Sequence, residues 1–285
     1  MSLNTTNNDC LITNPVKVMG IVNVTPDSFS DGGKFADIDN ALAQVECMIA
    51  NGVDIIDIGG ESTRPGAIEV SEHDEIARVI PLLRAIKSRF DIDVSIDTSK
   101  ANVMKAAIEN NADMINDVRA LQNKGCIEAV KDSNVEVCLM HMQGMPRTMQ
   151  TNPQYGNVID DIITFFNQRI ADCLQAGIER NRLILDPGFG FGKTLAHNYH
   201  LLANLNRFNQ LDLPLLAGIS RKSMIGNLLN RDVEQRLAGS LTAAIVAVQQ
   251  GASIIRVHDV QESVDAVAIL KAVAQYKEKI SLVSQ

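Results

Sequence analysis

The sequence is poor in the features that nucleic-acid-binding proteins use. It contains no tryptophan, and aromatic residues make up 4% of its 285 residues, so no stacking platform for single strands is expected. Its formal net charge is −8 at pH 7, and such an acidic chain does not attract phosphate backbones broadly. Nucleic acid is therefore not an expected partner.

Signals for membranes and for secretion are lacking as well. No uninterrupted apolar run approaches the ~18 residues that a transmembrane helix needs. Residues 1–10 (MSLNTTNNDC) have neither the basic nor the apolar region of a signal peptide. We expect no membrane partner, a flexible polar tail over residues 1–14, and one domain over residues 15–285.

Cysteines are few and follow no pairing pattern. Their number, five, is odd and none has CxxC spacing, which argues against a disulfide framework or a zinc site. This usage is typical of the reducing cytoplasm, where we expect the protein to be located. The cysteines are Cys10, Cys47, Cys126, Cys138 and Cys173.

What the sequence does contain is a repeated alternation of amphipathic helical segments with short apolar runs. Eight near-continuous apolar runs separated by helices are typical of a parallel sheet that helices cover. The count predicts a closed (β/α)8 barrel of the TIM type, in the α/β class; a doubly wound open sheet is the alternative, although it normally has fewer strands. The runs are Val16–Val22, Asp54–Ile58, Val94–Ile96, Met114–Ile115, Val135–Met140, Leu183–Leu185, Leu215–Ile219 and Ile254–Val257.

Polar residues close nearly every run, and in a parallel barrel they meet at one mouth, where such enzymes place their chemistry. Asp97, Asn116 and Asp186 follow the third, fourth and sixth runs and form a set of acceptors. Buried together, they suit a flat heterocycle rich in N–H donors, such as a 2-amino-4-oxo ring. Ser220 and Lys222 follow the seventh run.

A second set of polar residues favours an anion. Asn23 and Thr63 follow the first and second runs, Arg256 lies near the end of the eighth run and His258 follows it. These three runs are neighbours once a barrel closes. Many barrels bind phosphate in this region. Turn formation explains many residues at strand ends, but it does not explain Lys222, Arg256 or His258. The sequence therefore predicts a heterocycle at the centre and an anion at the rim.

Other motifs are assigned to the scaffold. The segment DPGFGFGKT (186–194) fits neither a Walker A loop nor a Rossmann fingerprint. We expect a flexible loop there, in which Phe189 and Phe191 cover a flat ligand. Asp57 is expected to be structural, and His141 to belong to a mobile loop that does not touch substrate. No clustered histidines or carboxylates predict a metal cage.

Seven segments, in order along the chain, resemble the signatures of the dihydropteroate synthases. The first two are MGIVNVTPDSFSDGGKF (19–35) and IDIGGESTRPGA (56–67). They are followed by IDTSK, INDV, LILDPGFGFGK, GISRKSMIG and RVHDV. The resemblance implies a transferase of folate biosynthesis that condenses 6-hydroxymethyl-7,8-dihydropterin pyrophosphate with p-aminobenzoate, giving 7,8-dihydropteroate and pyrophosphate. It also implies a (β/α)8 barrel, a homodimer and inhibition by sulfonamides.

The resemblance also assigns roles to single residues. The pterin would be held by Asp97, Asn116, Asp186 and Lys222. The pyrophosphate oxygens would be contacted by Thr63, Arg256 and His258, and Asn23 would be a ligand of the Mg2+ bound to the pyrophosphate. The p-aminobenzoate pocket would be bordered by Arg64, Pro65, Phe191 and Ser220.

In this family pyrophosphate leaves before the amine attacks, through a cationic pterin methylene. Residues 24–35 form a long polar loop after the first run. We expect its Asp27 and Asp31 to gain partners when Mg2+ and the pterin cation are present. The loop, with Glu61–Ala67, would then close as a lid over the p-aminobenzoate pocket. An aniline nitrogen needs no strong base once the carbon is cationic, which agrees with the lack of an obvious general base.

Two alternatives stay open at this point. Pterin-dependent methyltransferases of the same barrel family share a similar Asp/Asn pterin floor, but they do not need the anion site of Arg256 and His258. A non-catalytic barrel that only binds pterin is a further possibility. Release of pyrophosphate that requires p-aminobenzoate would separate both from a synthase.

Overall fold

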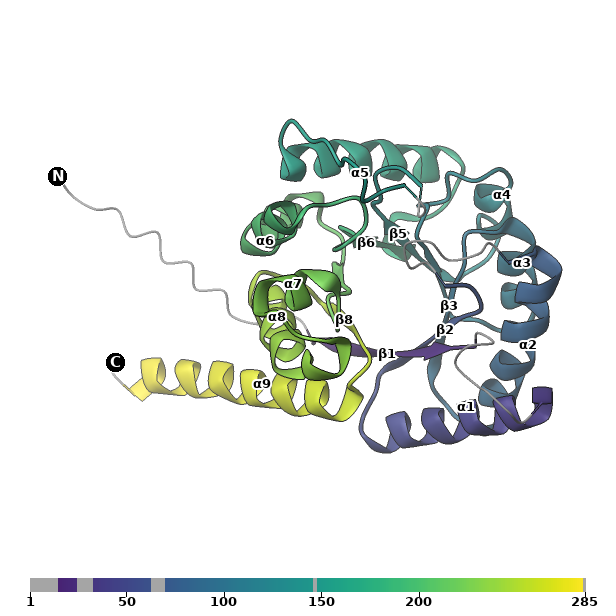
Figure 1. Ribbon diagram of the computed structural model, residues 1–285, viewed down its shortest axis with the longest axis horizontal. Coiled ribbons are helices and arrows are strands. Elements are labelled where there is room, and N and C mark those ends of the chain that lie inside the picture. Colours follow the sequence, from purple (N-terminus) through teal and green to yellow (C-terminus); the bar gives the residue numbers. More distant parts are fainter. Residues whose placement is uncertain (1–14, 25–32, 63–69, 146–147, 284–285) are drawn as a thin grey trace.

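Eight parallel strands form the inner wall of the protein, and helices surround them (Figure 1). The structure is a computed structural model that describes residues 15–24, 33–62, 70–145 and 148–283. Each predicted apolar run forms one strand, and the bounds agree within two residues at each end. The strands are β1 (Lys17–Asn23), β2 (Ile55–Gly59), β3 (Asp93–Asp97), β4 (Met114–Asp117), β5 (Glu136–Met140), β6 (Leu183–Asp186), β7 (Leu216–Ala217) and β8 (Ile254–Val257).

The strand order shows that the sheet closes on itself. Neighbours follow the order β6-β5-β4-β3-β2-β1-β8-β7. The last gap, between β6 and β7, is closed by a parallel bridge between Leu185 and Leu215 and by a 2.9 Å hydrogen bond from the Leu185 N–H to the Pro214 carbonyl. The predicted (β/α)8 barrel is confirmed.

Helices connect the strands and cover the barrel from outside. Three of them begin at side-chain caps of the usual kind: Ser71, Asn157 and Thr194 accept backbone N–H groups at the starts of α2, α5 and α6. None of the helices within the described ranges combines the length and the apolar character of a membrane span. The helices are α1 (Gly33–Ala50), α2 (Glu72–Arg89), α3 (Ala101–Glu109), α4 (Cys126–Val130), α5 (Val158–Gln175), α6 (Leu195–Ala203), α7 (Ser223–Leu229), α8 (Leu237–Gln249) and α9 (Val260–Val283), with 3-10 turns at Arg180–Arg182, Leu205–Leu211 and Val233–Gln235.

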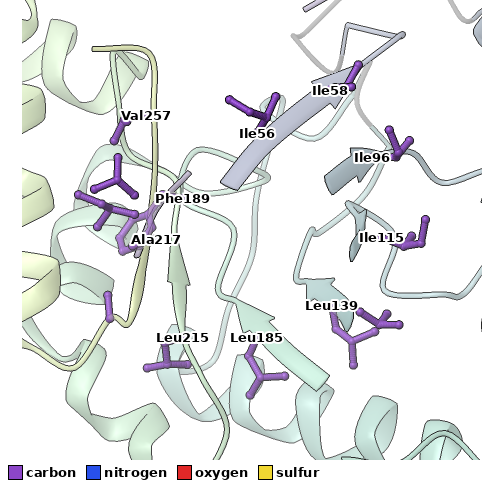
Figure 2. Close-up of a cluster of buried hydrophobic side chains, with 14 of the residues drawn as sticks. Ile56, Ile58, Ile96, Ile115, Leu139, Leu185, Phe189, Leu215, Ala217 and Val257 are labelled. Atoms are coloured by element: carbon purple, nitrogen blue, oxygen red, sulfur yellow. The ribbon is translucent and has the colours of Figure 1, made fainter. Parts of the chain in front are cut away.

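The strands are buried on both faces, which explains why their sequences are almost continuously apolar. Outward side chains such as Ile56, Ile115 and Leu139 lie in the layer between barrel and helices (Figure 2). Inward side chains form a separate apolar cluster that fills the lower barrel. Its members are Met19, Ile55, Met114, Cys138, Ile184, Leu216 and Ile254.

Candidate active site

A polar layer lies directly above the apolar cluster inside the barrel. Because side chains alternate between the two faces of a strand, residues two positions apart point the same way. The strands that place Ile55, Met114, Ile184 and Ile254 in the lower barrel therefore direct the residue two positions later inward as well. Those residues are Asp57, Asn116, Asp186 and Arg256, and Asp97 ends the neighbouring strand β3.

Arg256 is the central cation of this layer. Its Nε donates to Asp57 Oδ2 at 2.6 Å, and its Nη2 donates to Asp97 Oδ2 at 2.9 Å. The Asp57 side chain is fully buried, and Asn116 Nδ2 lies 3.5 Å from the same Oδ2. Two carboxylates thus share one guanidinium, and the group carries a net negative charge when both are ionised.

Burial makes two carboxyl groups of this layer, those of Asp97 and Asp186, weaker acids than they are in water. It raises the pKa of Asp97 to about 7; the Arg256 charge opposes this shift and the Asp57 charge adds to it. Burial also raises the pKa of Asp186, against the opposing effect of Lys222 and of the hydrogen bond from the Gly188 N–H. Such perturbed carboxyl groups in an enclosed site are typical of functional centres.

Lys222 lies beside Asp186 at the ends of β6 and β7. A Cβ atom on Gly218 would lie 3.8 Å from Lys222 Nζ and 3.9 Å from Asp186 Oδ2, so both charged groups lie next to this glycine. Lys222 Nζ donates to the Phe189 carbonyl and lies 4.6 Å from the centroid of the Phe191 ring. Burial lowers the pKa of Lys222 to about 8, and the Asp186 charge opposes this shift.

Ser220 and His258 contact each other directly. Ser220 Oγ accepts the His258 backbone N–H at 3.2 Å and lies 3.0 Å from His258 Nδ1. The sequence assigned these two residues to different ligands, p-aminobenzoate and pyrophosphate. Their contact means that the two regions adjoin after β7 and β8.

Asn23 lies at the end of β1 with its amide oxygen near the mouth. In register it pairs with Gly59, which pairs with Asp97. A Cβ on Gly59 would lie 3.3 Å from Asn23 Oδ1, so this glycine makes room for the amide. Five predicted site residues lie outside the described residues: Asp27, Asp31, Thr63, Arg64 and Pro65.

Comparison with known proteins connects this geometry to a family. The family model described as "Pterin binding enzyme" matches residues 19–258. The chain is 53% identical over 268 residues to a protein of Haemophilus influenzae named dihydropteroate synthase, covering 94% of this chain and 98% of the relative. The chain belongs to the dihydropteroate synthases of the pterin-binding enzyme family.

Solved dihydropteroate synthases have the same fold. A structure of the Yersinia pestis enzyme with a sulfonamide drug complex has a TM-score of 0.88 at 53% identity, covering 93% of this chain and 96% of that one. The Xanthomonas albilineans enzyme with 4-aminobenzoic acid has a TM-score of 0.86 at 47% identity, covering 92% and 94%. These relatives favour the synthase reaction over the methyltransferase alternative.

Some expectations for this dihydropteroate synthase are corrected by the structure. Phe189 is fully buried in the outer core, so it cannot cover a ligand; only Phe191 of that pair reaches the site. The segment after β6 is held by hydrogen bonds from Lys193 to Gly188 and Phe191 and is therefore not a loose loop.

Two further expectations concern Asp57 and His141. Asp57, expected to be structural, binds the guanidinium of Arg256 and holds that side chain in place. The sequence predicts a mobile loop at His141, but its side chain is buried just after β5, and its Nδ1 lies 3.0 Å from Lys193 Nζ. Sequence reasoning missed Lys193; the one available signal was its position directly after the glycine-rich segment of the signature LILDPGFGFGK.

Proposed function

We propose that the polar layer of this dihydropteroate synthase binds the pterin of 6-hydroxymethyl-7,8-dihydropterin pyrophosphate, which the enzyme condenses with p-aminobenzoate. The observation that carries the proposal is the position of three acceptors and one lysine directly above an apolar floor. The floor suits the face of a flat ring, and the acceptors suit its N–H edge. The four side chains are Asp97, Asn116, Asp186 and Lys222.

Asp186 is the proposed partner of the 2-amino and N3–H groups. A carboxylate presents two acceptors in one plane and so matches two parallel N–H donors. Asp186 Oδ1 accepts the Gly188 N–H at 2.8 Å, which fixes the orientation of the carboxylate. Asn116 and Lys222 add an amide and a cation for the remaining ring heteroatoms.

Arg256 and His258 are the proposed partners of the pyrophosphate. Arginine has five N–H donors, and the bonds to Asp57 and Asp97 use two of them. The other N–H groups of Arg256 can donate to anionic oxygens. The Asn23 amide, at the end of β1, adds a further polar group on this side of the barrel. Ser220 and Phe191 are the described residues proposed to border p-aminobenzoate.

Mg2+ is proposed at this rim as a partner of the substrate. The described part of the chain holds no cluster of three or more His, Cys, Asp or Glu residues suited to a metal. Magnesium commonly binds through one or two protein oxygens together with substrate phosphates. Asn23 Oδ1 is the proposed protein ligand. When bound, Mg2+ stabilises negative charge on the leaving pyrophosphate.

The residues of the layer act on the charges that develop during the reaction. The C–O bond to pyrophosphate breaks, its electron pair leaves with the pyrophosphate, and the methylene carbon becomes cationic. Asp97 and Asp186 favour that cation, while Arg256 and His258 favour the leaving anion. The p-aminobenzoate nitrogen then forms the C–N bond and releases a proton to solvent.

Homodimerisation and a cytoplasmic location also belong to the proposal. The resemblance to the family supports the dimer. Free thiols at Cys47, Cys126, Cys138 and Cys173 support a reducing compartment. Analytical ultracentrifugation of the purified chain tests the dimer: a single species at monomer mass across micromolar concentrations would contradict it.

Pyrophosphate release tests the function. Purified enzyme with dihydropterin pyrophosphate and Mg2+ is expected to release pyrophosphate in amounts equal to the dihydropteroate formed, and only when p-aminobenzoate is present. A sulfonamide is expected to reduce the yield of dihydropteroate. Release at an equal rate without p-aminobenzoate would show that this reading is wrong, and methyl transfer to a corrinoid protein would support the alternative.

A further inference from the structure

Lys193 is a buried lysine in the segment between β6 and α6. Only 3% of this residue is exposed. Its Nζ donates to the carbonyls of Gly188 at 2.9 Å and Phe191 at 3.1 Å, and it lies 3.0 Å from His141 Nδ1. An ammonium has three donors and no acceptor, so these three partners satisfy it fully.

The three contacts connect two segments that pack unusually closely. Gly188 and Gly192 have positive φ angles of 70° and 61°. A Cβ on Gly188 would lie 1.9 Å from the His141 carbonyl oxygen, and one on Gly192 would lie 2.4 Å from the Gln143 carbonyl oxygen. Only glycine fits at these two positions, so the segment after β6 lies directly on the chain after β5.

The same segment holds Lys222. The Phe189 carbonyl accepts a hydrogen bond from Lys222 Nζ, and the Phe191 ring lies 4.6 Å from that nitrogen. Lys193 Nζ donates to the carbonyl of Gly188, which precedes Phe189, and to the carbonyl of Phe191. It therefore spans the backbone that carries both contacts to Lys222.

We infer that Lys193 is a positioning residue of the pterin site: by tying Gly188 and Phe191 to His141, it fixes the segment that holds the Lys222 ammonium beside Asp186. This rests on the proposed role of Lys222 and Asp186 in pterin binding. Lys193 itself need not touch the ligand.

The surroundings of Lys193 suit this role in either protonation state. Burial lowers the pKa of Lys193 to about 7; the Asp186 charge opposes this shift and the Lys222 charge adds to it. Burial lowers the pKa of His141 to about 2, so its ring is neutral. Nδ1 can accept from an ammonium in one tautomer and donate to an amine in the other. The His141 ring is itself held edge-on to Phe165, with centroids 4.9 Å apart.

A double-mutant cycle tests the inference. The affinity of 6-hydroxymethylpterin is measured by calorimetry for the wild type, Lys193→Met, Lys222→Met and the double variant. Lys193→Met is expected to weaken binding about tenfold, and to have less than about a twofold effect when Lys222 is already absent. Lys87→Met is the control, because Lys87 also bonds a backbone carbonyl and a carboxylate, of Ile92 and Asp113, but away from the polar layer.

The outcomes separate the two proposals. If Lys222→Met binds the pterin as the wild type does, the proposed role of Lys222 is wrong. If Lys222→Met loses affinity but Lys193→Met does not, or the two losses simply add, Lys193 only supports the fold. Should Lys193→Met fail to fold, His141→Phe removes one of the three acceptors and keeps an aromatic ring. It is expected to weaken pterin binding in the same Lys222-dependent way, and unchanged affinity in His141→Phe overturns the inference.

Discussion

Arg256 donates a 2.9 Å hydrogen bond to Asp97, although the two residues lie 159 positions apart in the chain. The sequence pattern assigned Asp97 to the heterocycle and Arg256 to the anion. Their contact joins these two groups into one electrostatic unit, which Asp57 completes. Binding of pyrophosphate at Arg256 should therefore change the electrostatic potential at Asp97, where the pterin is proposed to bind. The pterin and pyrophosphate parts of the substrate should then not bind independently.

Removing the cation from this unit is expected to destabilise the fold. Arg256→Met leaves Asp57 and Asp97 without their shared partner, and breaking a buried pair in this way costs about 3–5 kcal/mol. The free energy of unfolding, measured with urea at pH 8, should fall by that order. Adding Asp57→Asn to Arg256→Met removes one uncompensated charge and should recover part of the loss. If the free energy of unfolding does not recover, the ionised Asp57 side chain is not stabilised by Arg256.

Asp97 is expected to make the stability depend on pH. Burial raises its pKa from 3.8 to about 7 in the folded state, so between these values the folded state binds more protons than the unfolded state. The free energy of unfolding of the wild type should therefore fall as pH rises from 4 to 7, by up to about 1.4 kcal/mol per pH unit from this group. Asp97→Asn should lack this component.

The comparison is made by urea denaturation at several pH values. Asp93→Asn, at the exposed opposite end of β3, controls for the loss of a carboxylate as such. An Asp97→Asn curve parallel to that of the wild type from pH 4 to 7 would contradict the raised pKa.

Asp186→Asn should weaken pterin binding. The substitution replaces one acceptor with a donor that faces a ligand donor, and mispaired buried polar groups cost about 1–3 kcal/mol, or about 5- to 150-fold in affinity. Calorimetry with 6-hydroxymethylpterin measures the change. Asp160→Asn, which removes an exposed carboxylate 3.3 Å from Arg207, should leave the affinity unchanged. Equal affinity of both variants would remove Asp186 from the pterin site.

The two phenylalanines after β6 should respond differently to substitution. Phe189 is fully buried, so Phe189→Ala should lower the free energy of unfolding by about 3–5 kcal/mol. Phe191 is half-buried and contacts the Lys222 ammonium, a cation–π interaction of about 0.5–2 kcal/mol. Phe191→Ala should therefore reduce ligand affinity more than stability. Thermal unfolding and calorimetry on both variants distinguish them, and the reverse pattern would contradict these positions.

The sequence was sufficient to predict the barrel because burial on both faces makes each strand a short apolar run. It also predicted Asp97, Asn116, Asp186 and Arg256 as residues of one mouth, because parallel strands end at the same rim. It could not predict which side chains pair there. The bond between Arg256 and Asp97 spans the barrel, and no local pattern encodes such a contact.

The environments of Lys193 and Phe189 could not be predicted for a related reason. Closely spaced glycines are typical of turns and loops, and they do not show whether the Phe189 or Lys193 side chain beside them is buried. In the folded chain the glycines allow this segment to pack on the residues after β5. Tertiary packing, which local sequence does not report, therefore decides which of these side chains are buried.

The short strand β7 gives the barrel a seam. Leu216–Ala217 is its full extent, and the described residues join β6 to β7 through the single bridge at Leu185 and Leu215. Segments with so few shared hydrogen bonds open at low free energy. Amide exchange at Leu185, whose N–H bonds across this bridge, should accordingly be faster than at Ile56 in β2, which pairs with β3 over five residues. Each opening would part Asp186 from Lys222. A ligand that contacts both Asp186 and Lys222 would hold β6 and β7 together at this bridge. Slower exchange of the Leu185 amide would then report occupancy of the site without any assay of turnover.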